Sequence, residues 1–197
     1  GWGQGAPPSA TFSQVSAGYK HSCGILTDSS VVCWGSTIEG QVAAPAGSFS
    51  QISSGYYHSC ALDAAGVVTC WGCQGGQDAG QCNGSVSTFL QISAGNKHTC
   101  GVRSDQTVEC WGCGAGQDHG QCAPPATTFY QVSAGATHTC GIDSTGEVQC
   151  WGLNFAGAIE PRPGPFSSVS VGNAHTCAIR LDGAVLCWGS DANGQAT

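Results

Sequence analysis

The sequence contains no methionine and very few charged residues. Only 9% of its 197 residues are charged, and the formal net charge is −7. Five positions carry a lysine or arginine: Lys20, Lys97, Arg103, Arg162 and Arg180. Nucleic acids and anionic membrane surfaces attract proteins through clustered cations. The composition therefore argues against both kinds of partner.

Long apolar segments are also missing. No apolar run approaches the roughly 18 residues that a membrane-spanning helix needs, so we expect no membrane insertion. Residues 1–30 lack the basic start and apolar stretch of a signal peptide. Because a primary translation product begins with methionine, we interpret the sequence as a processed chain or a piece of a longer one.

Cysteine, in contrast, is abundant, with 14 residues. A reducing cytosol would keep so many thiols open and reactive, whereas an oxidising compartment lets them pair. The even count allows every cysteine to be bonded. We therefore predict a secreted, soluble, extracellular protein.

Self-similarity along the chain reveals five copies of one repeat. The copies begin 37, 40, 40 and 37 residues apart, each at a phenylalanine: Phe12, Phe49, Phe89, Phe129 and Phe166. Each copy continues with a Val or Ile, a Gly, a His two residues before a Cys, a second Cys ten residues later, and a closing Trp-Gly. A Gly-Gln pair ends most copies, at Gln41, Gln81, Gln121 and Gln195.

The two cysteines of each repeat flank a polar turn and fit a β-hairpin. Turns such as "DAAG" and "DSTG" contain Asp and Gly, which tolerate a left-handed backbone. A three-residue loop whose last residue is left-handed, as at Gly66, Gly146 and Gly183, places the cysteines directly opposite each other. Such residues have Cβ atoms near the separation that a disulfide requires. We predict five intra-hairpin disulfides: Cys23–Cys33, Cys60–Cys70, Cys100–Cys110, Cys140–Cys150 and Cys177–Cys187.

Copies two and three carry a three-residue insert after Trp-Gly, together with two further cysteines. Because the insert and the extra cysteines occur together, we predict that they pair as Cys73–Cys82 and Cys113–Cys122. This pairing leaves no free thiol.

Short β units of this length, marked by Gly and Trp, predict an all-β tandem array of the β-propeller or β-solenoid kind. We expect a single repeat domain over residues 1–197, with five blades of 37–40 residues and a fourth strand near each Gly-Gln. Either the five blades close into a ring or they remain an open arc completed by other chains, and we prefer closure. The expected blades span about 5–41, 42–81, 82–121, 122–158 and 159–197.

The repeat resembles that of the regulator of chromosome condensation family. The stretch "VSAGYKHSCGILTDSSVVCWG", followed by "EGQV", has the family's order of Gly, His, apolar residues around a turn, Trp-Gly and Gly-Gln. The resemblance covers nearly the whole chain and implies a β-propeller, usually of seven blades. Members include a guanine-nucleotide exchange factor that binds chromatin and a secreted β-lactamase inhibitor. This chain differs in its five shorter repeats and their cysteine pairs, which indicate a secreted cysteine-rich variant.

No catalytic, cofactor or metal site emerges from the sequence. A phosphate-binding Gly-rich loop and a nucleophile elbow are both missing. Asp78 and Asp118 recur in the two inserts, but a calcium loop needs more oxygen ligands. The repeated histidines recur with the scaffold, so we predict hydrogen bonds within their own blades rather than zinc ligation. These histidines are His21, His58, His98, His138 and His175.

Two candidate surface features remain. Asn83 begins an "NGS" sequon and is predicted to carry an N-linked glycan in a secreted protein. The two residues before each repeated histidine vary among the copies, so we predict that they form an interaction rim on one side of the propeller. The rim residues are Tyr19, Lys20, Tyr56, Tyr57, Asn96 and Lys97.

These observations predict a non-enzymatic extracellular protein without a cofactor. Our first hypothesis is a structural subunit of a filament or other surface assembly, because repeat chains with unmatched ends can continue from one subunit to the next. The alternative is a secreted binding module that recognises a protein or a glycan through one rim. Self-association or other extracellular proteins are therefore the expected partners.

Overall fold

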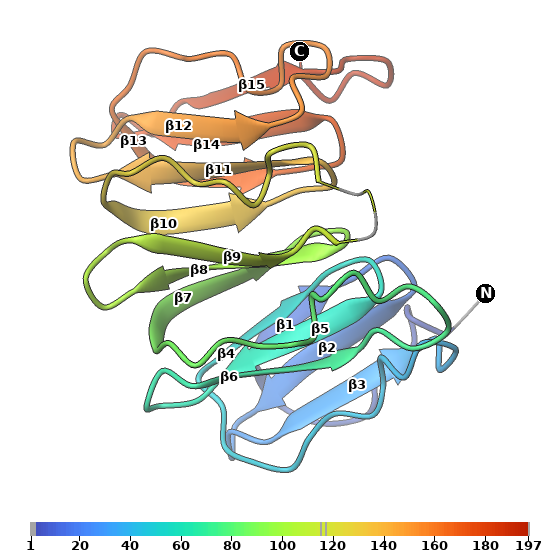
Figure 1. Cartoon of the computed structure of the whole chain (residues 1–197). Coiled ribbons are helices and arrows are strands. Elements are labelled where there is room, and N and C mark those ends of the chain that lie inside the picture. Colours follow the sequence, from blue (N-terminus) through green and yellow to red (C-terminus); the bar gives the residue numbers. More distant parts are fainter. Residues whose placement is uncertain (1–2, 115, 117, 197) are drawn as a thin grey trace.

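A computed structural model describes residues 3–114, 116 and 118–196. Within these residues the chain forms five three-stranded antiparallel sheets, one from each repeat, and each sheet keeps its strands in sequence order. We call these sheets blades 1 to 5. They follow one another in space as they do along the chain (Figure 1). None of the described residues belongs to a helix that is long and apolar enough to cross a membrane.

Each blade consists of a first strand and a hairpin. The strands of the blades are β1 (Phe12–Ala17), β2 (His21–Leu26) and β3 (Val31–Gly35); β4 (Gln51–Ser54), β5 (His58–Leu62) and β6 (Val68–Gly72); β7 (Phe89–Ala94), β8 (His98–Arg103) and β9 (Val108–Gly112); β10 (Phe129–Ala134), β11 (His138–Asp143) and β12 (Val148–Gly152); and β13 (Phe166–Val171), β14 (His175–Arg180) and β15 (Val185–Gly189).

The hairpin register follows from the turn, as the sequence predicts. The last loop residue is left-handed in every blade, with a Gly at 66, 146 and 183, Ser29 in blade 1 and Gln106 in blade 3. This loop sets Cys23 opposite Cys33, and the same pairing recurs in the other four hairpins. The five predicted intra-hairpin disulfides are confirmed, with Cα–Cα distances of 4.0 to 4.1 Å.

The insert cysteines also bond to each other. Cys73–Cys82 and Cys113–Cys122 join Cα atoms that are 6.2 and 6.4 Å apart. The described residues therefore contain seven disulfides within repeats and no free cysteine.

The hydrophobic core lies between consecutive blades. Cys23 and Ile25 of blade 1 pack against Phe49, Ile52 and Trp71 of blade 2, and the same arrangement recurs along the chain. We call the face with the disulfide and the next inward apolar residue, Cys23 and Ile25 in blade 1, the leading face. The face with the initial Phe and the closing Trp, Phe49 and Trp71 in blade 2, is the rear face. Each interface joins one leading face to one rear face.

The predicted fourth strand near Gly-Gln is wrong. The described residues there form turns, because the Gln41 side chain accepts a hydrogen bond from the Glu39 N–H at 2.9 Å. The Gln41 carbonyl accepts the Trp71 indole N–H at 2.8 Å. The segment is therefore a tail that caps the next blade rather than an outer strand.

The preferred closure of the five blades into a ring is also wrong. Sheets pack chiefly against their sequence neighbours, and blades 1 and 5 each leave one face uncovered (Figure 1). Val15 on the rear face of blade 1 is 65% exposed, and Val185 on the leading face of blade 5 is 67% exposed. The rotation between consecutive blades thus leaves the arc open.

Candidate functional site

The repeated histidines bridge neighbouring blades. His21 Nε2 lies 2.8 Å from Ser59 Oγ in blade 2, and His98 Nε2 lies 2.9 Å from Thr139 Oγ1 in blade 4. His58 and His138 make the equivalent contacts. The prediction of a structural role holds for these contacts, but the predicted location was wrong, because each partner belongs to the next blade. The sequence of one repeat does not reveal this contact, because the partner residue lies 38 to 41 positions further along the chain.

The hydrogen-bond chain fixes the histidine tautomer. Thr139 Oγ1 donates its proton to the Gln121 carbonyl at 3.2 Å, so its oxygen must accept from His98 Nε2–H. Thr99 Oγ1 likewise donates to the Gln81 carbonyl, so Nδ1 of His58 and of His98 is a buried acceptor without a partner. Burial lowers the pKa of His58 to about 3 and the pKa of His98 to about 4, with a further lowering from neighbouring histidines. These side chains are therefore neutral near pH 7.

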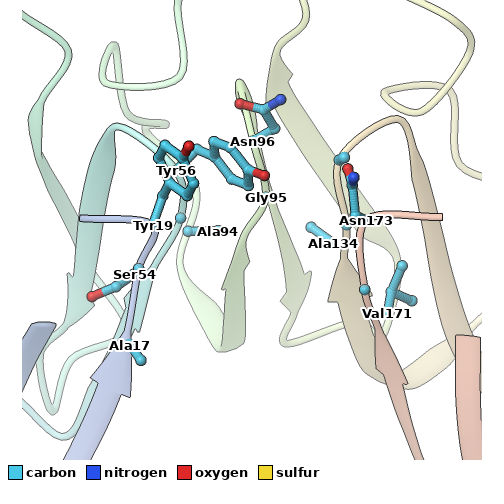
Figure 2. A pocket seen from close by; sticks show the side chains of 15 residues that line it. Ala17, Tyr19, Ser54, Tyr56, Ala94, Gly95, Asn96, Ala134, Val171 and Asn173 are labelled. Atoms are coloured by element: carbon cyan, nitrogen blue, oxygen red, sulfur yellow. The ribbon is translucent and has the colours of Figure 1, made fainter. Parts of the chain in front are cut away.

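We call the five repeated histidines the histidine ladder. Next to this ladder, the loops between the first and second strands surround one cavity of about 250 Å³ (Figure 2). Each blade contributes the same three positions: the end of the first strand, the following Gly, and the residue after it. The third position carries the side chains that vary, namely Tyr19, Tyr56, Asn96, Ala136 and Asn173.

Glycine at the second position lets the blades approach closely. A Cβ atom on Gly95 would overlap the Gly135 carbonyl oxygen of the next blade and would lie against the His98 ring. The neighbouring amides use the same carbonyls, since Tyr56 N–H donates to Gly95 O at 3.2 Å and Asn96 N–H donates to Gly135 O at 3.0 Å. The cavity wall is thus formed by main chain, and the variable side chains stand at its mouth.

Aromatic side chains gather on one side of this mouth. The rings of Tyr19 and Tyr56 stack with centroids 4.4 Å apart and an interplanar angle of 9°. Tyr57 meets Tyr56 edge-on at 5.8 Å, and Lys20 places its ammonium group 5.2 Å from the Tyr19 centroid. Asn96 lies beside the stacked pair, and Asn173 lies across the opening from it (Figure 2). The mouth therefore combines an aromatic surface with amide groups.

The structure brings most of the predicted rim residues together. Tyr19, Tyr56 and Asn96 line the cavity. Tyr57 and Lys20 contact the stacked rings without lining the cavity, and Lys97 does not line it either. Asn173 and Ala136, the equivalent residues of blades 5 and 4, also line the cavity, so this repeat position reaches it in all five copies.

The cavity lining suits binding rather than acid–base chemistry. Its side chains carry hydroxyl and amide groups, and none of them is a carboxylate, a histidine or a cysteine. The described residues also contain no group of three or more His, Cys, Asp or Glu side chains placed to hold a metal ion.

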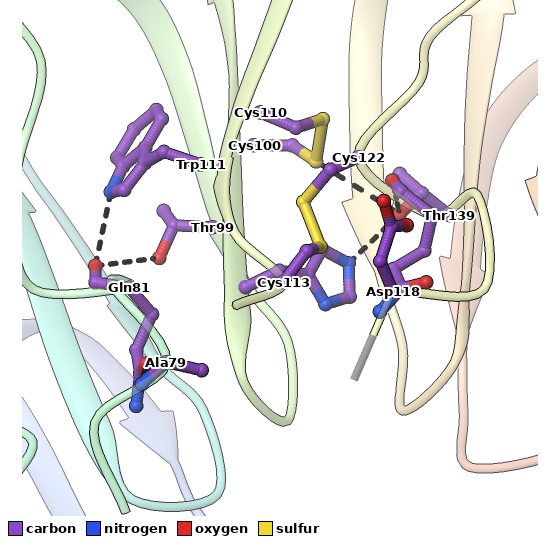
Figure 3. Close-up of a disulfide and its surroundings, with 12 residues drawn as sticks. Ala79, Gln81, Thr99, Cys100, Cys110, Trp111, Cys113, Asp118, Cys122 and Thr139 are labelled. Atoms are coloured by element: carbon purple, nitrogen blue, oxygen red, sulfur yellow. Dashed lines mark hydrogen bonds between the residues drawn. A yellow bond between two sulfur atoms is a disulfide. The ribbon is translucent and has the colours of Figure 1, made fainter. Parts of the chain in front are cut away.

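The insert aspartates stabilise backbone turns by accepting hydrogen bonds. Asp78 accepts the Gly80 N–H and Asp118 accepts the Gly120 N–H, each at 2.8 Å. Figure 3 shows Asp118 near the Cys113–Cys122 bridge. The inserts are therefore stapled loops whose carboxylates are already used by the backbone.

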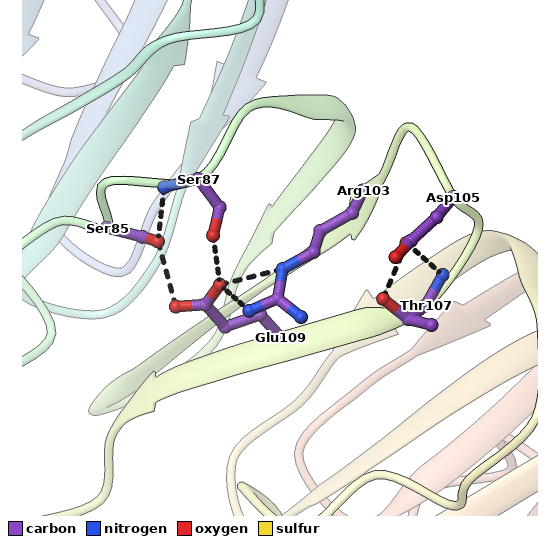
Figure 4. Close-up of polar contacts among 6 residues, drawn as sticks. All are labelled: Ser85, Ser87, Arg103, Asp105, Thr107 and Glu109. Atoms are coloured by element: carbon purple, nitrogen blue, oxygen red, sulfur yellow. Dashed lines mark hydrogen bonds and ion pairs between the residues drawn. The ribbon is translucent and has the colours of Figure 1, made fainter.

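Asn83 lies exposed in the connector that enters blade 3. The next hydroxyls along this connector, Ser85 and Ser87, donate to Glu109, which also pairs with Arg103 (Figure 4). Burial raises the pKa of Glu109, but these hydrogen bonds and the Arg103 charge outweigh burial and leave it below its usual value. The sequon is thus presented on an anchored connector.

Comparison with known protein families identifies the repeat. A family model described as the regulator of chromosome condensation (RCC1) repeat matches residues 12–41, 49–80, 89–121, 129–158 and 166–195. No curated protein matches the chain significantly.

Solved structures of plant receptor ectodomains are similar over 94% of the chain. The CRINKLY WD40 ectodomain of the Arabidopsis thaliana receptor kinase ACR4 is 28% identical, with a TM-score of 0.77, and the chain covers 67% of it. The entire ectodomain of the Physcomitrella patens receptor kinase CR4 is 26% identical, with a TM-score of 0.76. The chain spans only 52% of that ectodomain.

A more distant likeness shows the fold alone. Yeast RCC1 (Prp20), solved bound to Kap60, is 17% identical with a TM-score of 0.73, and the match covers 91% of this chain and 56% of that one. The repeat match extends over most of the sequence, and each matched repeat folds as one disulfide-bonded blade. The chain therefore belongs to the regulator of chromosome condensation (RCC1) repeat family.

Proposed function

We propose that the chain is a non-enzymatic extracellular binding module that takes its partner at the mouth of the cavity between the blades. The stacked Tyr19–Tyr56 pair at this mouth carries the proposal. Tyrosine is enriched among interface residues that dominate binding energy, because it buries a large rigid surface at low entropic cost. The disulfides and the likeness to receptor-kinase ectodomains support an extracellular location.

We favour a protein partner over a glycan. The rim offers aromatic rings, two amides and the Lys20 ammonium, and these groups surround the mouth of the cavity on loops of several blades. Protein interfaces are enriched in such aromatic side chains and have a polar border. The absence of carboxylate and histidine from the lining supports a role without catalysis.

Replacement of Tyr56 by Ala is expected to weaken binding at least tenfold, because it removes both the stack with Tyr19 and the edge contact with Tyr57. Peptides would be selected on the wild-type protein from a displayed library, and their affinities would be compared by calorimetry. A glycan array probed in parallel would identify a sugar ligand instead.

Phe155→Ala is the matched control, since Phe155 is an exposed aromatic residue that does not line the cavity. Selected ligands that bind the Tyr56 and Phe155 variants with equal affinity would place the binding surface elsewhere.

Asn83 is proposed to carry an N-linked glycan. Expression in a eukaryotic secretory host is expected to yield a protein whose mass falls after treatment with an N-glycan-releasing amidase. The Asn83→Gln variant is the control and should migrate as the treated protein does. Equal masses before and after treatment would contradict the assignment.

A structural role in a filament or other surface assembly is the second candidate. The observation that favours it is the pair of uncovered blade faces at the two ends of the arc. Electron microscopy of the unreduced protein tests this role, because ordered fibres would support it and discrete particles would count against it.

A further inference from the structure

The two uncovered faces are the two halves of an interface that occurs four times within the molecule. On the rear faces, the residue equivalent to Val15 is almost fully buried in every later blade, as Ile52 is at 3% exposure. On the leading faces, the residue equivalent to Val185 is buried in blades 2 to 4, as Val68 is at 7%. The end blades therefore present a leading face in blade 5 and a rear face in blade 1, each without its usual cover.

Four polar contacts recur at every interior interface, and blade 5 retains the groups for three of them. A histidine of the leading blade meets a Ser or Thr hydroxyl of the rear blade at 2.8 to 3.0 Å. A serine of the leading blade accepts a main-chain N–H of the rear blade at 2.9 to 3.0 Å. The carbonyl of the left-handed turn residue accepts the N–H of the rear blade's initial Phe at 2.8 Å.

Blade 5 retains these three groups of a leading face: His175, Ser170 and the Gly183 carbonyl. Among the described residues none makes the equivalent contacts with these groups, and His175 is less buried than the four other repeated histidines. The apolar residues Ile179 and Val185 stand beside these groups and are 41% and 67% exposed.

Blade 1 retains the complementary rear face. Ser22 supplies the hydroxyl, and the N–H groups of Ala17 and Phe12 occupy the two donor positions. An apolar hollow of about 370 Å³ lies on this face, and its lining includes Phe12, Val15 and Trp34. The hollow occupies the place where the interior rear faces receive the disulfide and the apolar residue of the preceding blade.

The tail position on blade 1 is already filled. Trp34 donates its indole N–H to the Gln4 carbonyl at 2.8 Å, as Trp71 does to Gln41. Ser22 donates to the same carbonyl at 3.3 Å, which leaves its oxygen free to accept from a histidine. What this face lacks is therefore the sheet of a preceding blade rather than its tail.

One position departs from the pattern. The interior leading blades carry a Gln that accepts another N–H of the rear blade, as Gln14 does from Ile52 at 2.8 Å. Blade 5 has Ser168 at this position, so one contact is lost. The other polar groups and the apolar residues of the blade 5 leading face are of the same types as those of the interior leading faces.

We propose that a second copy of this chain docks head to tail, with the leading face of blade 5 of one copy against the rear face of blade 1 of the next. The continuity with four existing interfaces identifies the occupant as a blade of this same repeat type. The inference deepens the structural role and does not depend on the rim cavity. Because the contact joins two different faces, it permits either closure or continued growth.

Val15→Asp and Val185→Asp test the proposal. Both side chains are exposed in the single chain, so each charge is tolerated there but would be buried without a partner in the docked pair. Sedimentation velocity over a concentration series up to about 1 mM is expected to show association of the wild type, at least tenfold weaker in either variant. Val86→Asp is the control, because Val86 is exposed in a connector outside both faces, and it should associate as the wild type does.

A mixture of the two variants gives the sharpest result. The Val15→Asp chain keeps an intact blade 5 face, and the Val185→Asp chain keeps an intact blade 1 face. The mixture is therefore expected to form one-to-one dimers and nothing larger at concentrations where each variant alone is monomeric. A wild type that stays monomeric throughout, or a variant that self-associates as strongly as the wild type, would overturn the proposal without affecting binding at the rim.

Discussion

Acidification from neutral pH to about pH 4.5 is expected to unfold the stacked blades, because four buried histidines must remain neutral in the folded protein. Burial lowers the pKa of His21 and His138 to about 4, as it does for His98, and lowers that of His58 to about 3. Each of the four side chains bridges two blades through Nε2. Protonation of one histidine therefore disturbs an interface as well as a blade.

The direction of the effect follows from proton uptake on unfolding. In the unfolded chain a histidine has its ordinary pKa of 6.5, whereas in the folded chain it takes up a proton only near pH 4 or below. The unfolded state thus binds more protons between these values. The free energy of unfolding is unaffected above pH 6.5 and falls as the pH drops from 6.5 towards 4.

The expected size of this effect is large. Each such histidine contributes up to about 1.4 kcal/mol per pH unit across this range. Four of them acting together over about two pH units approach the 5–15 kcal/mol that typically stabilises a folded domain. Urea unfolding of the disulfide-intact protein, followed by circular dichroism at a series of pH values, measures the loss.

The His58→Gln variant separates the ladder from other titrating groups. It should be less stable than the wild type at pH 7 and should lose less stability between pH 6.5 and 4.5. His119→Gln is the matched control, since His119 is exposed in an insert and lies outside the ladder. A wild-type free energy of unfolding that is constant between pH 6.5 and 4.5 would contradict the role assigned to the histidines.

The contrast between this ladder and the hairpins shows what a repeat sequence reveals. The pairing of Cys23 with Cys33 was predictable, because loop length and the left-handed turn residue fix the register within about ten residues of chain. The partner of His21 was not, because it depends on the rotation that places Ser59 of the next blade beside it. The hairpin register follows from the sequence of each repeat, whereas the angle between repeats depends on how the blades pack.

The same distinction explains the open arc and the rim. The repeat sequence does not determine the rotation between consecutive blades. The exposed faces at Val15 and Val185 therefore could not be predicted from it. The Tyr19 and Tyr56 positions were predictable as a shared loop class, because equivalent residues of successive blades must emerge on one side. Their stacking at 4.4 Å, and the place of Asn173 opposite, required the curvature of the array.

Gly55→Ala is expected to destabilise the protein by about 3 kcal/mol or more, because overpacking at a backbone contact cannot be relieved by a side-chain movement. A Cβ atom at this position would overlap the Gly95 carbonyl oxygen and would lie 2.9 Å from His58 Cε1. The blades would then have to separate where Tyr56 N–H donates to Gly95 O, which would also disturb the rim. Chemical denaturation of the variant measures the loss, and Gly5→Ala is the matched control, since a Cβ atom at Gly5 meets no atom within 4 Å. Equal stability of the two variants would show that the blades can move apart at little cost. Close approach at the cavity-lining glycines would then not determine the spacing of the blades.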